Sequence, residues 1–343
     1  MSADAASARI AIDAMGGDNA PAAIVAGACE AARRLDCTIV LVGELRATEP
    51  LLERCGHPGN VECVAADETV AMDEAAMAAV RRGGATSMGK TIELVRDGSA
   101  GAAFSAGNSG AFMAIATVRL RPLAGIARPA FATVWPARKG PMLVLDAGAN
   151  VDCRPEWIAQ FGVMGSAYAK AVLDIPRPRV AIISVGEERV KGNAQTIEAA
   201  RVLDSAPVTF VGNVEGKDVF ANVADVIVTD GFVGNVMLKL SEGAAMTILE
   251  IVVHEIKRGN LATKLGAILM RPALRRVAAR LNYENYGGAP LLGLRGNCIV
   301  AHGRASRHAI RSAIRAAVAE VREDVVGRIA ELVSREPERV PQP

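Results

Sequence analysis

Aromatic residues are scarce in this sequence, because Phe, Trp and Tyr make up only 3% of its 343 residues. Proteins that bind single-stranded nucleic acid stack the bases on aromatic side chains, and nucleic-acid binders in general carry a strong positive charge. The formal net charge here is only +2. We therefore expect no nucleic-acid partner. The hydrophobic content of 51% supplies an aliphatic core instead.

The sequence also lacks a cluster of cysteines and histidines with the spacing of a metal site. It has no C-x-x-C pair, and no close group of cysteines and histidines has the spacing of a zinc site. The cysteines are Cys29, Cys37, Cys55, Cys63, Cys153 and Cys298, and the histidines are His57, His254, His302 and His308. We expect no metal site and reduced thiols.

No signal peptide and no membrane span are indicated. The first residues, "MSADAASARIAID", have neither a basic nor a long apolar region. The longest uncharged run, 98–118, is too rich in Gly, Ser and Asn to cross a bilayer. We expect a cytoplasmic protein.

Short apolar runs alternate with longer helical patterns along the chain. This alternation predicts βαβ units and a largely parallel sheet that is covered by helices on both faces. Helices are expected at 21–35, 155–172 and 193–205. Strands are expected at 9–13, 38–42, 61–65, 101–105, 131–135, 142–146, 180–185, 208–212, 225–229 and 297–301. We expect one domain over 8–335, with a protruding segment at about 256–283 and a tail at 336–343.

Many of these strands run directly into a loop of Gly, Asn and small polar residues. Such loops lie at the carboxyl ends of strands, where open α/β sheets bind ligands. Glycine lets a ligand approach the backbone, and the N–H groups at the next helix N-terminus attract anions. Ordinary turn chemistry is the alternative, but the recurrence of the pattern favours an anion or phosphoryl site.

The run "GATSMGKT" at 84–91 matches the phosphate-binding P-loop pattern. A P-loop needs a buried strand before its glycines, whereas "AAMAAVRR" has helical character. We expect Thr86 or Ser87 to cap a helix that runs to Asp97, with Lys90 in its first turns.

The glycine-rich loops become recognisable when they are taken together. They are "IDAMGGDNAP", "SAGNSGA", "DAGANVDCRPE", "SVGEERVKGN", "GNVEGKD", "DVIVTDGFVGNVMLKLSEG" and "YGGAPLLGLRG". This ordered set resembles the phosphate acyltransferases of bacterial phospholipid synthesis, the PlsX family. The resemblance covers the chain from about Ile10 to the helix after Ser306.

The resemblance implies a fold and a reaction. The fold is a three-layer α/β/α sandwich similar to isocitrate and isopropylmalate dehydrogenases and to phosphotransacetylases. The reaction transfers a fatty acyl group from acyl-acyl carrier protein to inorganic phosphate, without a metal or other cofactor. The acyl phosphate then serves a membrane-bound glycerol-3-phosphate acyltransferase. The resemblance further implies a homodimer that associates with the membrane surface.

Two residues match positions that the resemblance associates with catalysis. Lys191 is the cation expected to hold phosphate and the developing oxyanion, although a lysine in such a loop can simply be solvated. Asn235 is expected to orient phosphate or the thioester carbonyl, with a helix N-cap as the alternative. Further residues expected to line the substrate site are Asp13, Asn19, Asn108 and Ser109. Since no cysteine has an obvious histidine partner, we expect bound phosphate to attack the thioester directly.

From Ile256 to Tyr283 the sequence has no acidic residue, and basic and apolar residues alternate at helical spacing. We expect a basic amphipathic helical pair that is broken at Pro272. Such a pair fits an anionic membrane surface, an acidic carrier protein or a dimer interface. Two other functions remain open: a phosphate acetyl- or butyryltransferase that uses acyl-CoA, and a nucleotide-binding regulator built on "GATSMGKT".

Overall fold

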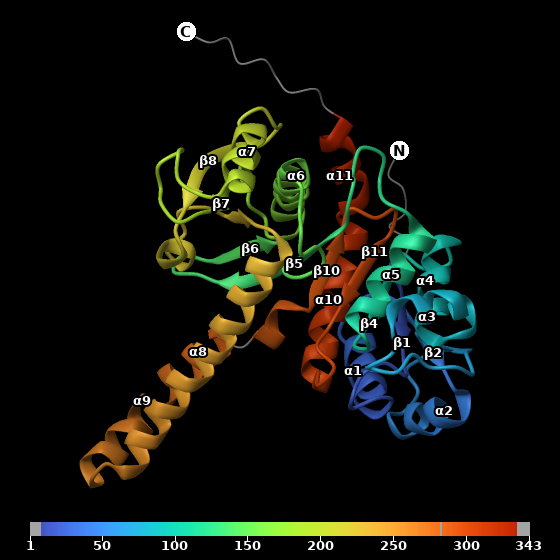
Figure 1. Cartoon of the computed structure of the whole chain (residues 1–343). Coiled ribbons are helices and arrows are strands. Elements are labelled where there is room, and N and C mark those ends of the chain that lie inside the picture. Colours follow the sequence, from blue (N-terminus) through green and yellow to red (C-terminus); the bar gives the residue numbers. More distant parts are fainter. Residues whose placement is uncertain (1–7, 282, 335–343) are drawn as a thin grey trace.

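The computed structural model describes residues 8–281 and 283–334, and the expected tail at 336–343 lies outside them. The described residues form an 11-stranded sheet with the order β3-β2-β1-β4-β11-β10-β5-β6-β9-β7-β8 (Figure 1). The strands are β1 (Ala8–Asp13), β2 (Cys37–Gly43), β3 (Val61–Ala65), β4 (Ala102–Ser105), β5 (Ala130–Pro136), β6 (Pro141–Leu145), β7 (Arg179–Ile183), β8 (Thr209–Val214), β9 (Val226–Val228), β10 (Ala289–Leu292) and β11 (Asn297–Val300).

Helices cover both faces of this sheet, which gives the predicted three-layer α/β/α sandwich. The helices are α1 (Ala22–Ala32), α2 (Leu45–Arg54), α3 (Ala76–Arg82), α4 (Ser87–Arg96), α5 (Ser109–Leu120), α6 (Pro155–Val172), α7 (Ala194–Leu203), α8 (Gly231–Arg258), α9 (Leu261–Leu281), α10 (Arg307–Arg322) and α11 (Val325–Ser334). One face packs against α1, α2, α6, α7, α10 and α11, and the other against α4, α5 and the start of α8.

The two halves of the sheet run in opposite directions. β1 to β4 and β11 are parallel to one another, and so are β6, β9, β7 and β8. β10 and β5 join these two sets through antiparallel pairings. The register crosses the centre through the pairs Ile299–Pro290, Leu291–Phe131 and Ala132–Leu145. In each central strand, the residue that pairs on one side is next in sequence to the residue that pairs on the other side: Pro290 is next to Leu291, and Phe131 is next to Ala132. The end of β11 and the end of β6 therefore lie at the same level of the sheet. Since the two sets of strands approach this level from opposite directions, the loops after both sets converge there.

The strand β10 was not predicted from the sequence. It has four residues and lies between Gly287–Gly288 and Gly293, all of which have positive φ. Its residues "APLL" form too short a run between flanking glycines to show strand periodicity, so the sequence alone predicts a loop there.

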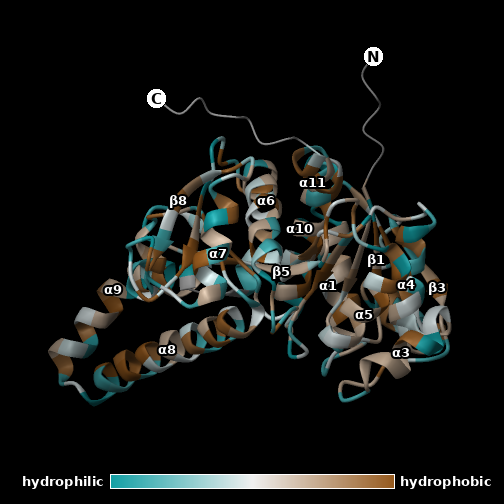
Figure 2. Ribbon diagram, turned by 45° about the horizontal axis from the view of Figure 1, so that its top comes forward, coloured by the Kyte–Doolittle hydropathy of each residue, from teal (hydrophilic) through white to brown (hydrophobic). Residues whose placement is uncertain are grey.

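The basic stretch forms a helical hairpin, but its boundaries differ from the prediction. The expected break at Pro272 is wrong, because Pro272 lies inside α9. The chain turns instead at Gly259 and Asn260, where the Asn260 side chain accepts a hydrogen bond from the Thr263 N–H at 3.0 Å. Both helices project from the sandwich, and apolar residues line α8 (Figures 1 and 2). The projecting segment is therefore longer than 256–283.

None of the described helices combines the length and the apolar character needed to cross a membrane.

One buried carboxyl group gives the fold a pH-dependent stability. Glu320 of α10 is 1% exposed, and its Oε1 has no hydrogen-bond partner among the described residues. Burial raises the pKa of Glu320 well above its ordinary value. The folded state therefore retains a proton that the unfolded state loses above about pH 4.5, so this group's contribution to stability falls as the pH rises toward the folded pKa.

Glu320→Gln should remove this dependence. We expect the free energy of unfolding of the variant to exceed that of the wild type increasingly as the pH rises from 5 to 8. The limiting slope is about 1.4 kcal/mol per pH unit. Urea unfolding at several pH values measures the difference, with the exposed Glu53→Gln as the control. Parallel stability curves for wild type and Glu320→Gln would contradict the assignment.

Candidate active site

The loop after β6 is organised around the carboxylate of Asp146, which is fully buried. Oδ1 accepts the backbone N–H groups of Phe131, Gly148 and Ala149 at 3.0 to 3.1 Å. Oδ2 accepts the backbone N–H of Asn150 at 2.7 Å and its side-chain amide at 2.9 Å. Burial raises the pKa of Asp146, and these donors oppose the rise. The carboxylate therefore fixes the loop from inside.

This arrangement corrects one part of the sequence interpretation. The glycine-rich loops were expected to leave backbone N–H groups free for an anion. At 148–150 these groups donate to Asp146, so they are not available to an anion.

Asn235 lies beside this loop in the second turn of α8. It is not the helix cap: the Asp230 side chain accepts the Val233 N–H at 2.9 Å and takes that role. Side-chain atoms of Asn235 lie 3.5 to 3.7 Å from where a Cβ at Gly148 would stand. The Asn235 side chain is exposed, and its amide makes no hydrogen bond to any residue that the structure describes. It is free to bind a substrate.

Gly234 allows this close approach of α8. A Cβ at Gly234 would stand 1.9 Å from the carbonyl oxygen of Asp146, so a larger residue would displace the helix. Gly234, the second glycine in "GFVGN", is thus required because α8 packs closely against the loop after β6.

Lys191 lies on the loop after β7, and its backbone is held on both sides. Its N–H donates to the Glu188 carbonyl at 2.9 Å, and its carbonyl accepts the Ser184 hydroxyl at 3.0 Å. The next residue, Gly192, has a φ of +125°, which glycine adopts without strain. The Lys191 side chain is exposed, and its ammonium forms no ion pair within the described ranges.

The loop that carries Lys191 and the start of α8, which carries Asn235, lie at one edge of the sheet. β9 pairs with β6 on one side and with β7 on the other, so the loops after these three strands are neighbours. Asn193 caps α7 through the Thr196 N–H at 2.8 Å. In the first turn of α7, the Gln195 side chain donates to the Cys153 carbonyl, which ties this helix start to the loop after β6. The first two amides of α7 thus face the same edge as Lys191.

In the other half, Asn108 and Ser109 lie at the start of α5. Asn108 is the helix cap: its Oδ1 accepts the Ala111 N–H at 3.0 Å, and its amide donates to the Glu74 carbonyl at 2.9 Å. Both ends of this side chain are thus occupied within the protein. Ser109 is exposed at the first position of α5. Ala111 and Ala147 belong to one hydrophobic cluster, so this helix start and the loop after β6 pack on the same face of the sheet.

Asp13 and Asn19 occupy positions in the framework. Asp13 is 1% exposed and accepts the hydroxyls of Ser87 at 2.6 Å and Ser105 at 2.7 Å. Burial raises the pKa of Asp13. The amide of Asn19 donates to the Arg304 carbonyl at 3.3 Å. Asp13 thus joins β1, β4 and α4, and substrate contact for these two residues stays a prediction.

The "GATSMGKT" run folds as predicted, as a helix cap. The helix α3 precedes it instead of a strand, and the Thr86 hydroxyl accepts the Gly89 N–H at 3.0 Å. The Lys90 ammonium donates to the Ala65 carbonyl at 2.8 Å. The lysine that would bind nucleotide phosphates in a P-loop therefore has a structural partner here.

Among the described residues, Cys153 is a cysteine that lies in one of the loops at this edge, the loop after β6. Its thiol is buried and lies 3.3 Å from the Asn150 carbonyl. Burial raises the pKa of Cys153 to about 12, so the thiol is protonated at neutral pH and is a poor nucleophile. In the part of the chain that the structure describes, no group of three His, Cys, Asp or Glu side chains can hold a metal ion.

Sequence reasoning missed the roles of Asp146 and Asp230. Both directly follow a strand and precede a glycine-containing loop or helix, which is the signal of a residue that binds nearby backbone N–H groups. The glycine-rich motifs that contain these two residues carry the family resemblance, but the sequence does not show which backbone N–H groups their carboxylates accept.

Comparison with known proteins adds a family to this geometry. A family model described as "Fatty acid synthesis protein" matches residues 8–328. A curated relative from Pelotomaculum thermopropionicum, named phosphate acyltransferase, is 48% identical over 323 residues, covering 94% of this chain and 93% of the relative. The relative of the same name from Myxococcus xanthus is 47% identical over 331 residues, with 95% and 94% coverage. A third, from Thermodesulfovibrio yellowstonii, is 44% identical and covers 96% of both chains.

Solved structures of phosphotransacetylases share the fold. The EutD phosphotransacetylase from Staphylococcus aureus superimposes with a TM-score of 0.62 at 14% identity, covering 92% of this chain and 94% of that one. A phosphotransacetylase from Streptococcus pyogenes gives a TM-score of 0.62 at 16% identity, with the same coverage. The expected likeness to phosphotransacetylase folds is confirmed.

Proposed function

Because this chain belongs to the phosphate acyltransferase family, and is therefore an acyltransferase, we propose that it transfers a long-chain acyl group from acyl-acyl carrier protein to inorganic phosphate. The observation that carries the proposal is the pair Lys191 and Asn235. Both are exposed at one edge of the sheet and make no side-chain bond to the described residues.

The chemistry assigns a role to each of them. A phosphate oxygen attacks the thioester carbonyl, the new C–O bond forms, and the C–S bond breaks. The proton of hydrogen phosphate passes to the departing thiolate, which leaves the carrier protein with a free thiol. Lys191 neutralises phosphate and the tetrahedral oxyanion, and the Asn235 amide orients one of them. The amides at the start of α7 and α5, together with Ser109, supply further donors for the anion.

Transfer in this scheme is direct, without an acyl-enzyme. The raised pKa of Cys153 supports this, because a protonated thiol is a weak nucleophile. Phosphate held next to the thioester needs no covalent relay, since positioning alone supplies much of the acceleration.

The identity of the acyl donor distinguishes this function from the alternative, a short-chain phosphate acyltransferase that uses acyl-CoA. The phosphotransacetylase fold keeps that alternative open. The test incubates the protein with phosphate and either palmitoyl-acyl carrier protein or acetyl-CoA, without ATP, and traps acyl phosphate with hydroxylamine. We expect kcat/KM to be far higher with the acyl carrier protein donor. A clear preference for acetyl-CoA would assign the short-chain function.

The α8–α9 hairpin is the part that we assign to the membrane. Its outer end carries the exposed apolar residues Leu261, Leu265, Ile268, Leu269 and Met270, with Leu269 exposed by 83%. The basic residues Lys257, Arg258, Lys264 and Arg271 lie next to them or between them in the sequence. Apolar side chains among basic ones fit an anionic bilayer surface, and the protein then delivers acyl phosphate to a membrane-bound glycerol-3-phosphate acyltransferase. The protein is accordingly cytoplasmic and bound to the inner face of the membrane.

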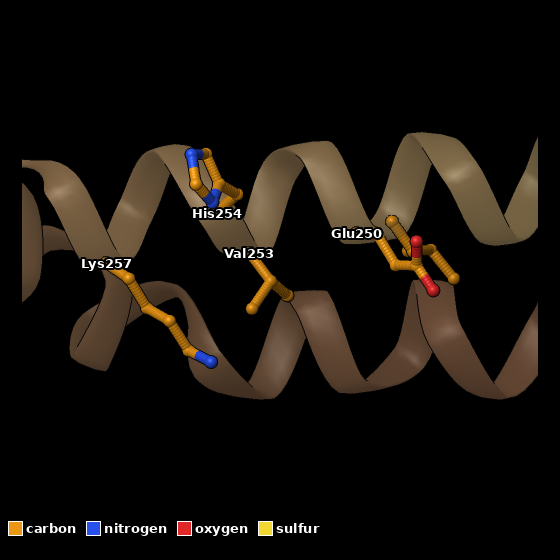
Figure 3. A pocket seen from close by; sticks show the side chains of 5 residues that line it. Glu250, Val253, His254 and Lys257 are labelled. Carbon is orange, nitrogen blue, oxygen red and sulfur yellow. The ribbon is translucent and has the colours of Figure 1, made fainter.

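Nearer the sandwich, α8 exposes Leu240, Met246 and Ile248, each by 60% or more. We assign this inner part of α8 to a homodimer interface, because exposed apolar patches of this kind mark contacts with another protein. A shallow cavity of about 360 Å³ lies along α8, lined by Leu249, Glu250, Val253, His254 and Lys257 (Figure 3). It contains neither Lys191 nor Asn235, so it is not the proposed catalytic site.

The double variant Leu265→Asn/Leu269→Asn should weaken binding to anionic vesicles by about a hundredfold or more, because each of the two leucines contributes about 1.5 to 3 kcal/mol when it is buried in lipid. Turnover with soluble substrates should change little. Vesicle cosedimentation measures the binding. The matched control, Met77→Asn/Val118→Asn, removes two exposed apolar side chains from the sandwich and should bind like the wild type. Unchanged partitioning of the hairpin variant would count against the membrane assignment.

A further inference from the structure

A basic cavity lies between α1 and α10, on the half of the sheet opposite to Lys191. Its volume is about 450 Å³. The lining residues are Glu30, Arg33, Arg34, Arg307, His308 and Arg311. No residue of the candidate active site belongs to it.

The arginines exceed the acidic charge that faces them. Glu30 lies 3.5 Å from Arg307 and 3.2 Å from Arg311, and it is the acidic residue of the cavity lining. Arg33 donates to the Cys55 carbonyl, and Arg34 has no partner within the described chain. The cavity lining thus has four guanidinium groups and one carboxylate, which pairs with two of them.

The start of α10 adds to this positive charge. Arg307 and His308 occupy its first turn, which has no acidic residue, although the N-terminus of a helix favours negative charge. Arg307 is also 71% exposed. Such a placement costs stability, and local rules of this kind are typically broken where a surface meets a partner. The partner that relieves the repulsion is an anion.

The cavity adjoins the edge where the strands converge. α10 begins seven residues after Val300, the last residue of β11. The intervening loop carries Arg304, 84% exposed, and is tied to the loop after β1 by Asn19. A partner bound at α1 and α10 would therefore lie next to the loops after β1, β4 and β11, beside the active-site edge.

The surface around the cavity favours a protein partner over a membrane. Neither α1 nor α10 has an exposed large hydrophobic side chain among its described residues, whereas the α8–α9 hairpin has many. Interfacial membrane binding needs apolar side chains to insert, but docking of an acidic protein needs charge and shape. We propose that the arginine cavity between α1 and α10 is the docking surface for the acidic acyl carrier protein, an inference that rests on the proposed function.

The test uses the double variant Arg34→Glu/Arg307→Glu, which reverses two of the exposed charges of the cavity. The dissociation constant for fluorescently labelled acyl carrier protein should rise by about tenfold or more, and binding of the wild type should weaken with added salt. The loss in kcat/KM should be at least about tenfold larger with palmitoyl-acyl carrier protein than with palmitoyl-phosphopantetheine, which has no carrier. The control Arg177→Glu reverses the charge of an exposed residue just before β7, and it should leave the dissociation constant and kcat/KM unchanged.

Three outcomes would overturn the docking surface. Equal losses with both donors would mean a structural effect, which thermal melting and the milder Arg34→Gln/Arg307→Gln variant would reveal. Unchanged affinity for the carrier, or reduced binding to anionic vesicles alone, would assign the cavity elsewhere. A wild type that binds the carrier through these arginines but forms no acyl phosphate would refute the proposed function and leave the docking surface supported.

Discussion

Lys191→Ala should lower kcat/KM for acyl phosphate formation by about a hundredfold to a thousandfold, the usual cost of removing a group that stabilises an oxyanion. The loop should survive the change. Its hydrogen bonds use the backbone of Lys191, whose N–H donates to Glu188 and whose carbonyl accepts from Ser184. The lost function is therefore the charge. Steady-state rates at varied phosphate concentration measure the effect, and the KM for phosphate should rise.

A matched control separates this role from a general effect of surface charge. Lys170 is also exposed, at the last turn of α6, and Lys170→Ala should retain wild-type rates. Lys191→Arg keeps the charge but not the compact ammonium, so partial activity is expected. A Lys191→Ala protein within about threefold of the wild type would remove Lys191 from the proposed mechanism, since even one ordinary donor contributes more than that.

Asp146→Asn should lower the free energy of unfolding by about 2 to 4 kcal/mol and abolish most activity. The carboxylate receives five hydrogen bonds from described donors. An asparagine keeps one oxygen, but its NH₂ group would face the two donors of Asn150. Buried donors without an acceptor are costly, and the loop that Asn235 contacts at Gly148 would shift. Chemical unfolding and steady-state kinetics measure the two effects.

Asp152→Asn provides the control on the same loop. Asp152 is exposed and no described donor faces its carboxylate, so the same chemical change should alter neither stability nor turnover. If Asp146→Asn is as stable as Asp152→Asn, the carboxylate does not organise the loop.

The sheet and its layers could be predicted because local sequence determines them. The predicted strand at 61–65 and helix at 155–172 match β3 and α6, and the cap at Thr86 is confirmed. Apolar runs bounded by glycine and capping residues carry enough local information for this. The register across β10 and β5 does not have a local signal. Its β10–β5 pairing joins residues about 160 positions apart, such as Leu291 and Phe131, and this pairing decides that both sets of strands end at one level.

The hairpin shows a second limit. Proline normally breaks a helix, which favoured a turn at Pro272. The turn lies at Gly259 because Asn260 caps α9, a signal that is weaker in sequence than proline. Likewise, Asn235 and Asn108 are both asparagines near the start of a helix, but of these two only Asn108 caps its helix. The partner of each amide depends on tertiary contacts.

A single-turnover experiment tests the central claim, that phosphate bound at this edge attacks the thioester directly. The protein in excess is mixed with palmitoyl-acyl carrier protein and phosphate, and samples are quenched over time. Acyl phosphate and free carrier thiol should appear at the same rate, with no acyl group attached to the protein by mass spectrometry. Carrier thiol released ahead of acyl phosphate, with palmitoylated protein at the early times, would contradict direct transfer.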